Sequence, residues 1–177
     1  MTYPQPQLKF VLLTAEALSA LLANRLDVAS EAIGLSLPAR FLEDQWLWQI
    51  RLDQIRENPS SAPWLARATV RLDDGAVIGR AGFHGPPDER GMVEIGYEVS
   101  AEYRRMGYGR ATAMALIEEA AMHTGVTVVR ASVSPDNAPS LAVVRGLGFV
   151  QVGEQIDEID GLELVFELPI GGGESLV

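Results

Sequence analysis

The chemistry of this chain is most apparent in one hexapeptide, Arg104-Arg105-Met106-Gly107-Tyr108-Gly109, which is followed by Arg110. The segment before it, Met92–Val99, has the composition of a strand, and residues 110–123 are strong helix formers. Two glycines at this joint would let backbone N–H groups turn inward at the N-terminus of the helix, where unpaired donors and the helix dipole favour an anion. We interpret the hexapeptide as a pyrophosphate cradle; the alternative is a plain strand-to-helix turn with solvated arginines.

Three side chains before this segment could exchange a proton. Glu94 lies in the strand before the cradle and is the candidate general base, acting directly or through a water; the alternative is an outward-facing carboxylate paired with an arginine. Glu98 shares the face of Glu94 if the strand is unbroken, a relation that a β-bulge would remove. His84 ends a strand, and we expect an exposed loop residue there, with the alternative that it faces a substrate.

Composition and charge exclude several classes of protein and site. A chain of 177 residues fits one domain with a real core, and a net charge of −10 opposes nucleic-acid binding, which needs a basic face. The absence of cysteine excludes disulfides and thiolate sites, and with only two histidines we expect no metal. The first residues lack a signal-peptide pattern, and the apolar stretch 12–23 is too short to span a bilayer. We therefore expect a cytoplasmic protein that binds neither membrane nor nucleic acid.

Strands and helices alternate along the chain in an order that predicts one α/β domain built on a mixed sheet. The domain spans residues 1–170, and residues 171–177 are expected to form a mobile tail. Asp73-Asp74-Gly75 and Asp160-Gly161 are turn signals, whereas residues 25–37 are either a loop or a broken helix. The expected strands are 8–13, 66–72, 76–83, 92–99, 126–134, 149–159 and 162–168, and the expected helices are 14–24 (capped by Thr14), 38–57, 110–123 and one from Ser134 or Asn137 to Gly146.

The combination of these motifs resembles the GCN5-related N-acetyltransferase (GNAT) family. An Arg-x-x-Gly-x-Gly signature begins at Arg104, and the companion pattern Asn137-Ala138-Pro139-Ser140 is followed by Gly148-Phe149. The segment Glu94-Ile95-Gly96-Tyr97 looks like the branch that acetylates N-terminal amines of ribosomal proteins and various small amines. A P-loop fits worse because no lysine follows Gly109, and a dinucleotide fingerprint would need a third glycine. The resemblance implies a mostly antiparallel sheet flanked by helices.

The resemblance further implies an enzyme that transfers an acetyl group from acetyl-CoA to a primary amine by direct attack, on a small molecule or a protein N-terminus. Backbone N–H groups of the cradle would bind the pyrophosphate, and the N–H of Val99 would polarise the acetyl carbonyl. Ser140 would protonate the departing sulfur, because relatives with a tyrosine acid carry it where this chain has Val144. Asn137 would contact the cofactor or cap its helix. The expected cofactor-binding residues are Tyr97, Val99, Arg104, Arg105, Met106, Gly107, Tyr108, Gly109, Arg110, Asn137 and Ser140, and the expected catalytic residues are Glu94 and Ser140.

The acceptor and the partners are less constrained by the sequence. The alternative to an enzyme is a non-catalytic acyl-CoA-binding module that senses or scaffolds. Trp46, Trp48 and Trp64 could line an acceptor pocket, although we expect Trp46 in the core and Trp48 exposed or at an interface. The acidic chain could attract cationic acceptors such as polyamines, aminoglycosides or basic peptide N-termini. Exposed apolar residues would be compatible with a homodimer.

Overall fold

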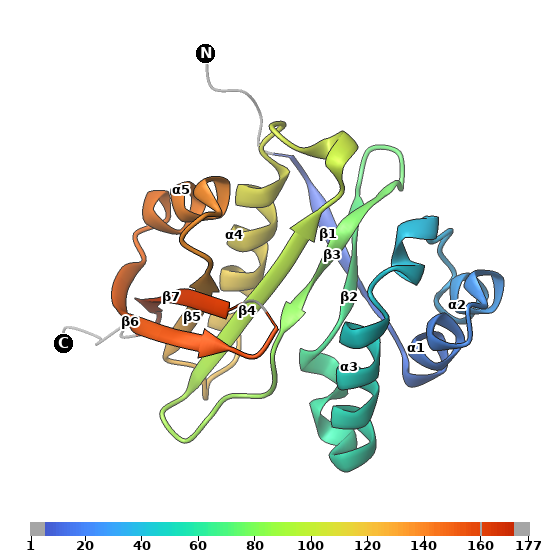
Figure 1. Cartoon of the computed structure of the whole chain (residues 1–177), viewed down its shortest axis with the longest axis horizontal. Coiled ribbons are helices and arrows are strands. Elements are labelled where there is room, and N and C mark those ends of the chain that lie inside the picture. The colour runs from blue at the N-terminus through green and yellow to red at the C-terminus, as the bar shows by residue number, and fades with distance from the viewer. Residues whose placement is uncertain (1–5, 160, 172–177) are drawn as a thin grey trace.

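The computed structural model describes residues 6–159 and 161–171, which form a seven-stranded sheet flanked by helices (Figure 1). The strand order is β1-β2-β3-β4-β5-β7-β6, and every neighbouring pair is antiparallel except β4 and β5. This architecture confirms the mixed, mostly antiparallel sheet. Asp160 of the second predicted turn and residues 172–177 of the predicted tail lie outside the described residues. The strands are β1 (Leu8–Leu12), β2 (Arg67–Arg71), β3 (Val77–Phe83), β4 (Met92–Val99), β5 (Val128–Val133), β6 (Val150–Asp157) and β7 (Gly161–Pro169).

The N-terminal helices lie against the half of the sheet that contains β1 and β2. Thr14 caps the first helix as predicted, because its Oγ1 accepts the Ala17 N–H at 3.1 Å. Residues 25–37, which the sequence left open, contain a helix that ends at Gly34 with φ 66°. The helices of this layer are α1 (Ala15–Leu22), α2 (Leu26–Ile33), η1 (Ala39–Leu42), α3 (Gln45–Glu57) and η2 (Pro59–Trp64), of which η1 and η2 are 3-10 helices.

A break at Asp44 divides the single helix expected over residues 38–57, so that expectation is wrong. Asp44 has ψ 38°, outside the helical range, and its carboxylate accepts Nε of Arg80 at 2.7 Å. The burial of the two tryptophans is also the reverse of the expected one. Trp48 is fully buried and stacks on Phe41, whereas Trp46 is 44% exposed. The prediction that the two indoles face different sides holds, but the side assigned to each was wrong, because the expected helix continued through Asp44.

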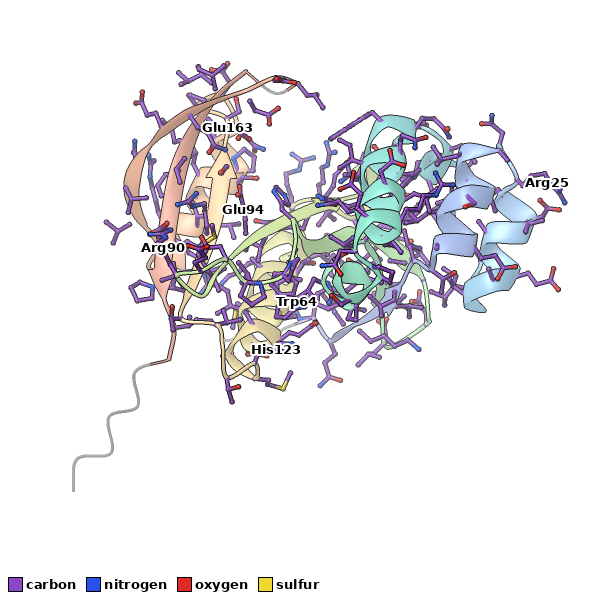
Figure 2. The ribbon with its side chains drawn as sticks, turned by 90° about the horizontal axis from the view of Figure 1, so that it is seen from below. Arg25, Trp64, Arg90, Glu94, His123 and Glu163 are labelled. Carbon is purple, nitrogen blue, oxygen red and sulfur yellow. The ribbon has the colours of Figure 1, made fainter. Side chains whose placement is uncertain are left out.

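The other face of the sheet is covered by α4 (Tyr108–Ala121) and α5 (Ala138–Gly146), preceded by the short 3-10 helix η3 (Ala101–Tyr103). Its core contains Val93 and Ile95 of β4 packed with Ala113 and Leu116 of α4. Trp64 belongs to this side, 5.4 Å from the Phe83 ring and beside His123 (Figure 2). None of the described helices is long and apolar enough to cross a bilayer.

The sheet divides between β4 and β5. These strands pair only where Met92–Glu94 meets Val128–Arg130. Beyond that point β4 continues to Val99 against β3, while β5 continues to Val133 against β7. The two halves of the sheet therefore diverge, and two strand edges face one another without pairing (Figure 1).

Candidate active site

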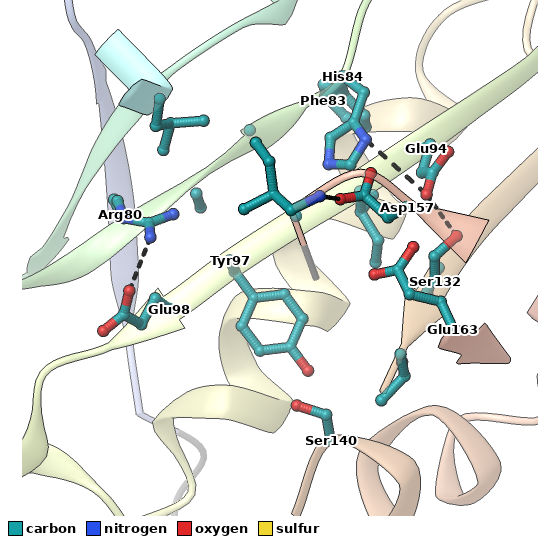
Figure 3. A pocket seen from close by; sticks show the side chains of 18 of the residues that line it. Arg80, Phe83, His84, Glu94, Tyr97, Glu98, Ser132, Ser140, Asp157 and Glu163 are labelled. Carbon is teal, nitrogen blue, oxygen red and sulfur yellow. Dashed lines mark hydrogen bonds and ion pairs between the residues drawn. The ribbon is translucent and has the colours of Figure 1, made fainter. Parts of the chain in front are cut away.

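A cleft of about 880 Å³ lies where β4 and β5 diverge (Figure 3). Of the predicted site residues, it brings together both candidate catalytic residues, Glu94 and Ser140, with Tyr97, Arg104 and Asn137. The rest of the predicted cofactor set is outside its lining: Val99 at the end of β4, and residues 105–110 at the start of α4. Within residues 6–159 and 161–171, no three histidine, aspartate or glutamate side chains converge as a metal site.

The free edge of β4 presents alternate backbone groups to the cleft. The His84 N–H donates to the Glu94 carbonyl, and the Ser100 N–H donates to the Ile78 carbonyl, both at 2.8 Å. Even-numbered residues of β4 therefore pair with β3, and the N–H groups of Tyr97 and Val99 point to the opposite edge. That edge has no strand partner beyond Glu94, so it can pair with an extended ligand.

The cradle has the geometry of an anion site at the N-terminus of α4. Gly107 caps the helix with φ 84°, and Arg105 also has a positive φ, 60°. Among the described residues, no backbone N–H from 105 to 110 has a hydrogen-bond acceptor. Six consecutive donors at a helix N-terminus can therefore bind phosphate oxygens.

The side chains of the cradle contact the protein itself. Arg104 turns back and donates from Nε to the Val99 carbonyl at 3.0 Å, while Arg110 donates to the Gly146 carbonyl at 3.2 Å. Tyr108 is buried and accepts a hydrogen bond from Arg71 at 3.1 Å. Asn137 caps α5 by accepting the Ser140 N–H at 3.2 Å. The backbone N–H groups of this segment are therefore open to an anion, and cofactor contacts by its side chains stay a prediction.

Glu94 is held in the cleft by a chain of hydrogen bonds. Ser132 Oγ donates to Glu94 Oε1 at 2.6 Å, and Gln155 Nε2 donates to Ser132 Oγ at 3.1 Å. No arginine in the described chain lies within 4.0 Å of the Glu94 carboxylate, so the alternative of an arginine-paired carboxylate is wrong. The nearest titratable partner is His84, whose Nδ1 lies 3.8 Å from Oε1.

His84 stands in the cleft, over Gly96 of the neighbouring strand. A Cβ at position 96 would lie 2.8 Å from His84 Nε2, so the missing side chain makes room for the ring. The side chain is 48% exposed, which fits the expectation of an exposed residue, but it also lines the cleft beside Glu94. Desolvation lowers the pKa of His84 below 6.5, against the opposing charge of Glu94, so the imidazole is neutral near pH 7. The sequence left a cleft-facing His84 open as the alternative, but its place over Gly96 could not be read from the sequence because Gly96 is twelve positions away along the chain.

Glu98 also faces the cleft, but ion pairs hold it. Its carboxylate contacts Arg40, accepts Arg80 Nη2 at 2.8 Å and lies 3.7 Å from Arg104 Nη2. Arg80 also binds Asp44 at 2.7 Å, which joins the start of α3 to the sheet. Glu98 is therefore a structural anchor that joins β4 to Arg40 and Arg80.

Tyr97 lies on the opposite face of β4, with its hydroxyl directed toward Ser140 (Figure 3). This hydroxyl is buried and lacks a hydrogen-bond partner among the described residues. Burial raises the pKa of Tyr97 to about 12, despite the nearby Ser140 hydroxyl, so the phenol stays protonated. Val144, which stands where some relatives carry a tyrosine acid, lines the same region. The Tyr97 hydroxyl, which comes from β4, is thus a second hydroxyl near Ser140.

The sequence matches the family model of the acetyltransferase (GNAT) domain over residues 11–150. That match covers most of the chain, and the chain therefore belongs to the GNAT family. The uncharacterized N-acetyltransferase YjdG of Bacillus subtilis (strain 168) is 37% identical over 81 residues, which are 46% of this chain and 48% of that protein. The matched stretch spans about half the length of the curated relatives.

Solved structures have the same fold at low sequence identity. A ribosomal-protein alanine acetyltransferase from Vibrio fischeri is 18% identical with a TM-score of 0.61, covering 96% of this chain and 95% of that chain. The aminoglycoside acetyltransferase AAC(6')-Ib in complex with coenzyme A is 19% identical with a TM-score of 0.59, covering 92% and 95%. These similarities confirm the fold that the motifs implied.

Proposed function

We propose that this chain is an acetyl-CoA-dependent N-acetyltransferase that acetylates a primary amine by direct attack. One observation carries the proposal: the Glu94–His84 pair and the open edge of β4 face the same cleft, beside unpaired N–H groups at the start of α4. A similar protein is named an N-acetyltransferase, and a structure of similar fold contains coenzyme A. The cytoplasmic location stays a prediction.

The donor would occupy the cradle and the edge of β4. The pyrophosphate of CoA would accept hydrogen bonds from the N–H groups of residues 105–110. The pantetheine would pair along Tyr97–Val99, where the N–H groups point into the divergence of the sheet. The N–H of Val99 would then polarise the acetyl carbonyl at the carbon that is attacked.

The transfer exchanges one bond and moves two protons. The amine nitrogen bonds to the acetyl carbon as the carbon–sulfur bond breaks, and the Glu94–His84 pair accepts one proton from the nitrogen. The departing thiolate takes a proton from the Ser140 hydroxyl, which regains one from solvent while the Glu94–His84 pair releases the proton of the amine to solvent; the protonated Tyr97 phenol beside Ser140 is a further donor. His84 is suited to its part because it is neutral, and Ser132 orients the Glu94 carboxylate.

The decisive experiment measures CoA release with a panel of amines for the wild type and Glu94→Gln. We expect the variant to lose about 10²- to 10⁴-fold in kcat while binding acetyl-CoA normally, because general acid–base catalysis contributes that much. Glu154→Gln, an exposed β6 carboxylate outside the cleft, is the matched control and should keep full activity. Tight CoA binding without turnover of any amine would instead support a non-catalytic acyl-CoA-binding module.

A homodimer stays part of the proposal. The edge strand β6 exposes Val150, Val152 and Ile156, which are 64%, 54% and 77% accessible. Exposed apolar side chains on an unpaired strand edge favour association with a second copy. Light scattering after size-exclusion chromatography would measure the mass, and a monomer at micromolar concentration would contradict this assembly.

A further inference from the structure

The arginines that line the cleft differ in their partners. Of these, Arg80 and Arg104 each lie within 4.0 Å of the Glu98 carboxylate, as does Arg40 outside the lining. Arg51 of α3 instead donates to Gln54 Oε1 at 2.8 Å and to the His84 carbonyl at 3.4 Å. No carboxylate in residues 6–159 and 161–171 lies within 4.0 Å of its guanidinium. Among the described residues, Arg51 is therefore the cleft arginine with no carboxylate in direct contact, although the charge of Glu94 acts on it from a longer distance.

The Arg51 side chain is partly buried and still carries its positive charge. Burial, reinforced by the positive charge of Arg80 and opposed by Glu94, lowers the pKa of Arg51 to about 10, so the side chain is still cationic at neutral pH. Removing such a charge from water without a counterion is costly. A guanidinium also presents paired donors that match the two oxygens of a carboxylate. An anionic group on the ligand would supply the missing partner.

Apolar side chains adjoin Arg51 on the same wall. Trp46 and Ile50 lie four residues apart on α3, so they share one face of the helix. Both line the cleft, and they are 44% and 40% exposed. Large apolar side chains left accessible inside a cleft can bury an apolar part of a ligand.

The opposite wall carries the reverse charge. Glu94 lies on β4, and Asp157 and Glu163 line the cleft from the β6–β7 hairpin. Figure 2 shows the labelled Glu94 and Glu163 on the side of the hairpin, across from α3. The cleft therefore has a cationic and apolar wall facing an acidic one, and the ammonium group of a ligand fits the acidic side beside the proton-accepting pair.

We propose that the acceptor is an amino acid with an apolar side chain, whose carboxylate binds Arg51 and whose side chain packs on Trp46 and Ile50. The amine then faces Glu94 and His84. This assignment rests on the proposed acetyltransferase function and names its substrate class. A polyamine lacks the anionic group, and its additional positive charges would be repelled by Arg51.

The acceptor test compares four amines under one assay of CoA release: phenylalanine, phenylalaninamide, phenethylamine and spermidine. We expect the KM of phenylalanine to be lower than that of its amide by about 10- to 100-fold, the factor expected for a hydrogen bond to a charged group. The ammonium group of phenylalaninamide loses its proton more easily than that of phenylalanine, so the amide is the more reactive amine in solution. A preference for phenylalanine would therefore have to come from binding. A lower KM for the amide or for spermidine would overturn the inference.

The residue test uses Arg51→Gln, with Arg56→Gln of the same helix as the matched control. Arg56 is exposed and pairs with Asp53. The Arg51 variant should lose the preference for phenylalanine and keep its KM for phenylalaninamide and its affinity for acetyl-CoA. An equal loss on all acceptors would mean that Arg51 only joins α3 to the end of β3, and would overturn the inference.

A binding measurement separates this inference from the proposed function. Phenylalanine is titrated calorimetrically into the complex of the protein with CoA, without any turnover. Saturable binding that Arg51→Gln abolishes would support the amino-acid site even if no acetylation occurred. Absence of binding to a wild type that acetylates other amines would overturn the inference and leave the acetyltransferase function standing.

Discussion

The two sides of the cleft are built from different parts of the chain. The proposed donor side uses main-chain groups: the edge of β4 at Tyr97 in the cleft and, beyond the lining of the cleft, Val99 and the N–H groups of residues 105–110. The acceptor side uses side chains from separate segments, among them Arg51 of α3 and His84 after β3. Main-chain sites tolerate changes of side chain as long as the backbone conformation is kept, whereas the acceptor side depends on individual residues. Substitutions on the two sides should therefore fail in different ways.

The largest effect that we expect from a small change is on the acceptor side, at Gly96. In Gly96→Ala the new Cβ would lie 2.8 Å from His84 Nε2, so the imidazole must leave its present position over Gly96 and beside Glu94. Because the displaced group is the end of a side chain, the fold should remain stable. We expect kcat to fall about 10²-fold, as for loss of a proton acceptor.

Gly153→Ala is the control for Gly96→Ala, because a Cβ at position 153 of β6 meets nothing within 4 Å. Steady-state kinetics and thermal unfolding would be measured for both variants. Full activity in Gly96→Ala would show that the position of the His84 ring over Gly96 does not contribute to turnover. A loss of activity in both variants would contradict the difference between the two glycines.

A smaller effect, and one on binding, is expected on the donor side. Gly107→Ala would force an alanine to φ 84°, a conformation that costs about 1 to 2 kcal/mol and distorts the cradle. We expect the KM for acetyl-CoA to rise about tenfold, equivalent to one weakened hydrogen bond to a charged group, with a smaller change in kcat.

Gly75→Ala is the control for Gly107→Ala, because it introduces similar backbone strain at a position outside the proposed acetyl-CoA site. Gly75 lies in the β2–β3 hairpin at φ 73°, with nothing within 4 Å of a built Cβ. It should lose similar stability in chemical denaturation and leave the KM for acetyl-CoA unchanged. An equal rise of KM in the two variants would refute the assignment of the cradle to the donor.

The smallest effect is expected from pH. In the proposed mechanism the reactive form has neutral His84, whose pKa is lowered by desolvation, so the acid limb of kcat/KM that is due to His84 should lie below pH 6.5. The same group binds fewer protons in the folded than in the unfolded state, so its contribution reduces stability as pH falls below 6.5. A rate profile with an acid limb above pH 6.5 would contradict the neutral imidazole, and His84→Gln should move or remove the limb.

The difference between the two sides also explains what the sequence could predict. The donor motifs are contiguous, so the spacing of Gly107 and Gly109 and the pattern from Asn137 to Ser140 indicated two helix N-termini and the family, although α4 begins at Tyr108 and not at the predicted Arg110. The bounds of β4 were predicted as observed. These features depend on local backbone preferences, which a short sequence segment determines.

The acceptor side required information that no single segment contains. The positions of Trp46 and Trp48 depended on a break at Asp44, which is stabilised by Arg80 from a distant strand. The place of His84 depended on the strand register that sets Gly96 beneath it. Arg51 was not singled out, because its lack of a counterion appears only after the other arginines have been placed.

Because β4 and β5 diverge, the cleft between them is lined by residues from both faces of the sheet. Glu94 and Glu98 point to the face that carries α3, whereas the Tyr97 ring packs on the side of α4. The two substrates would enter from opposite faces and meet only within the thickness of the sheet. Exchange of residues on α3 could then change the amine that is accepted while the thioester site on the other face is left intact.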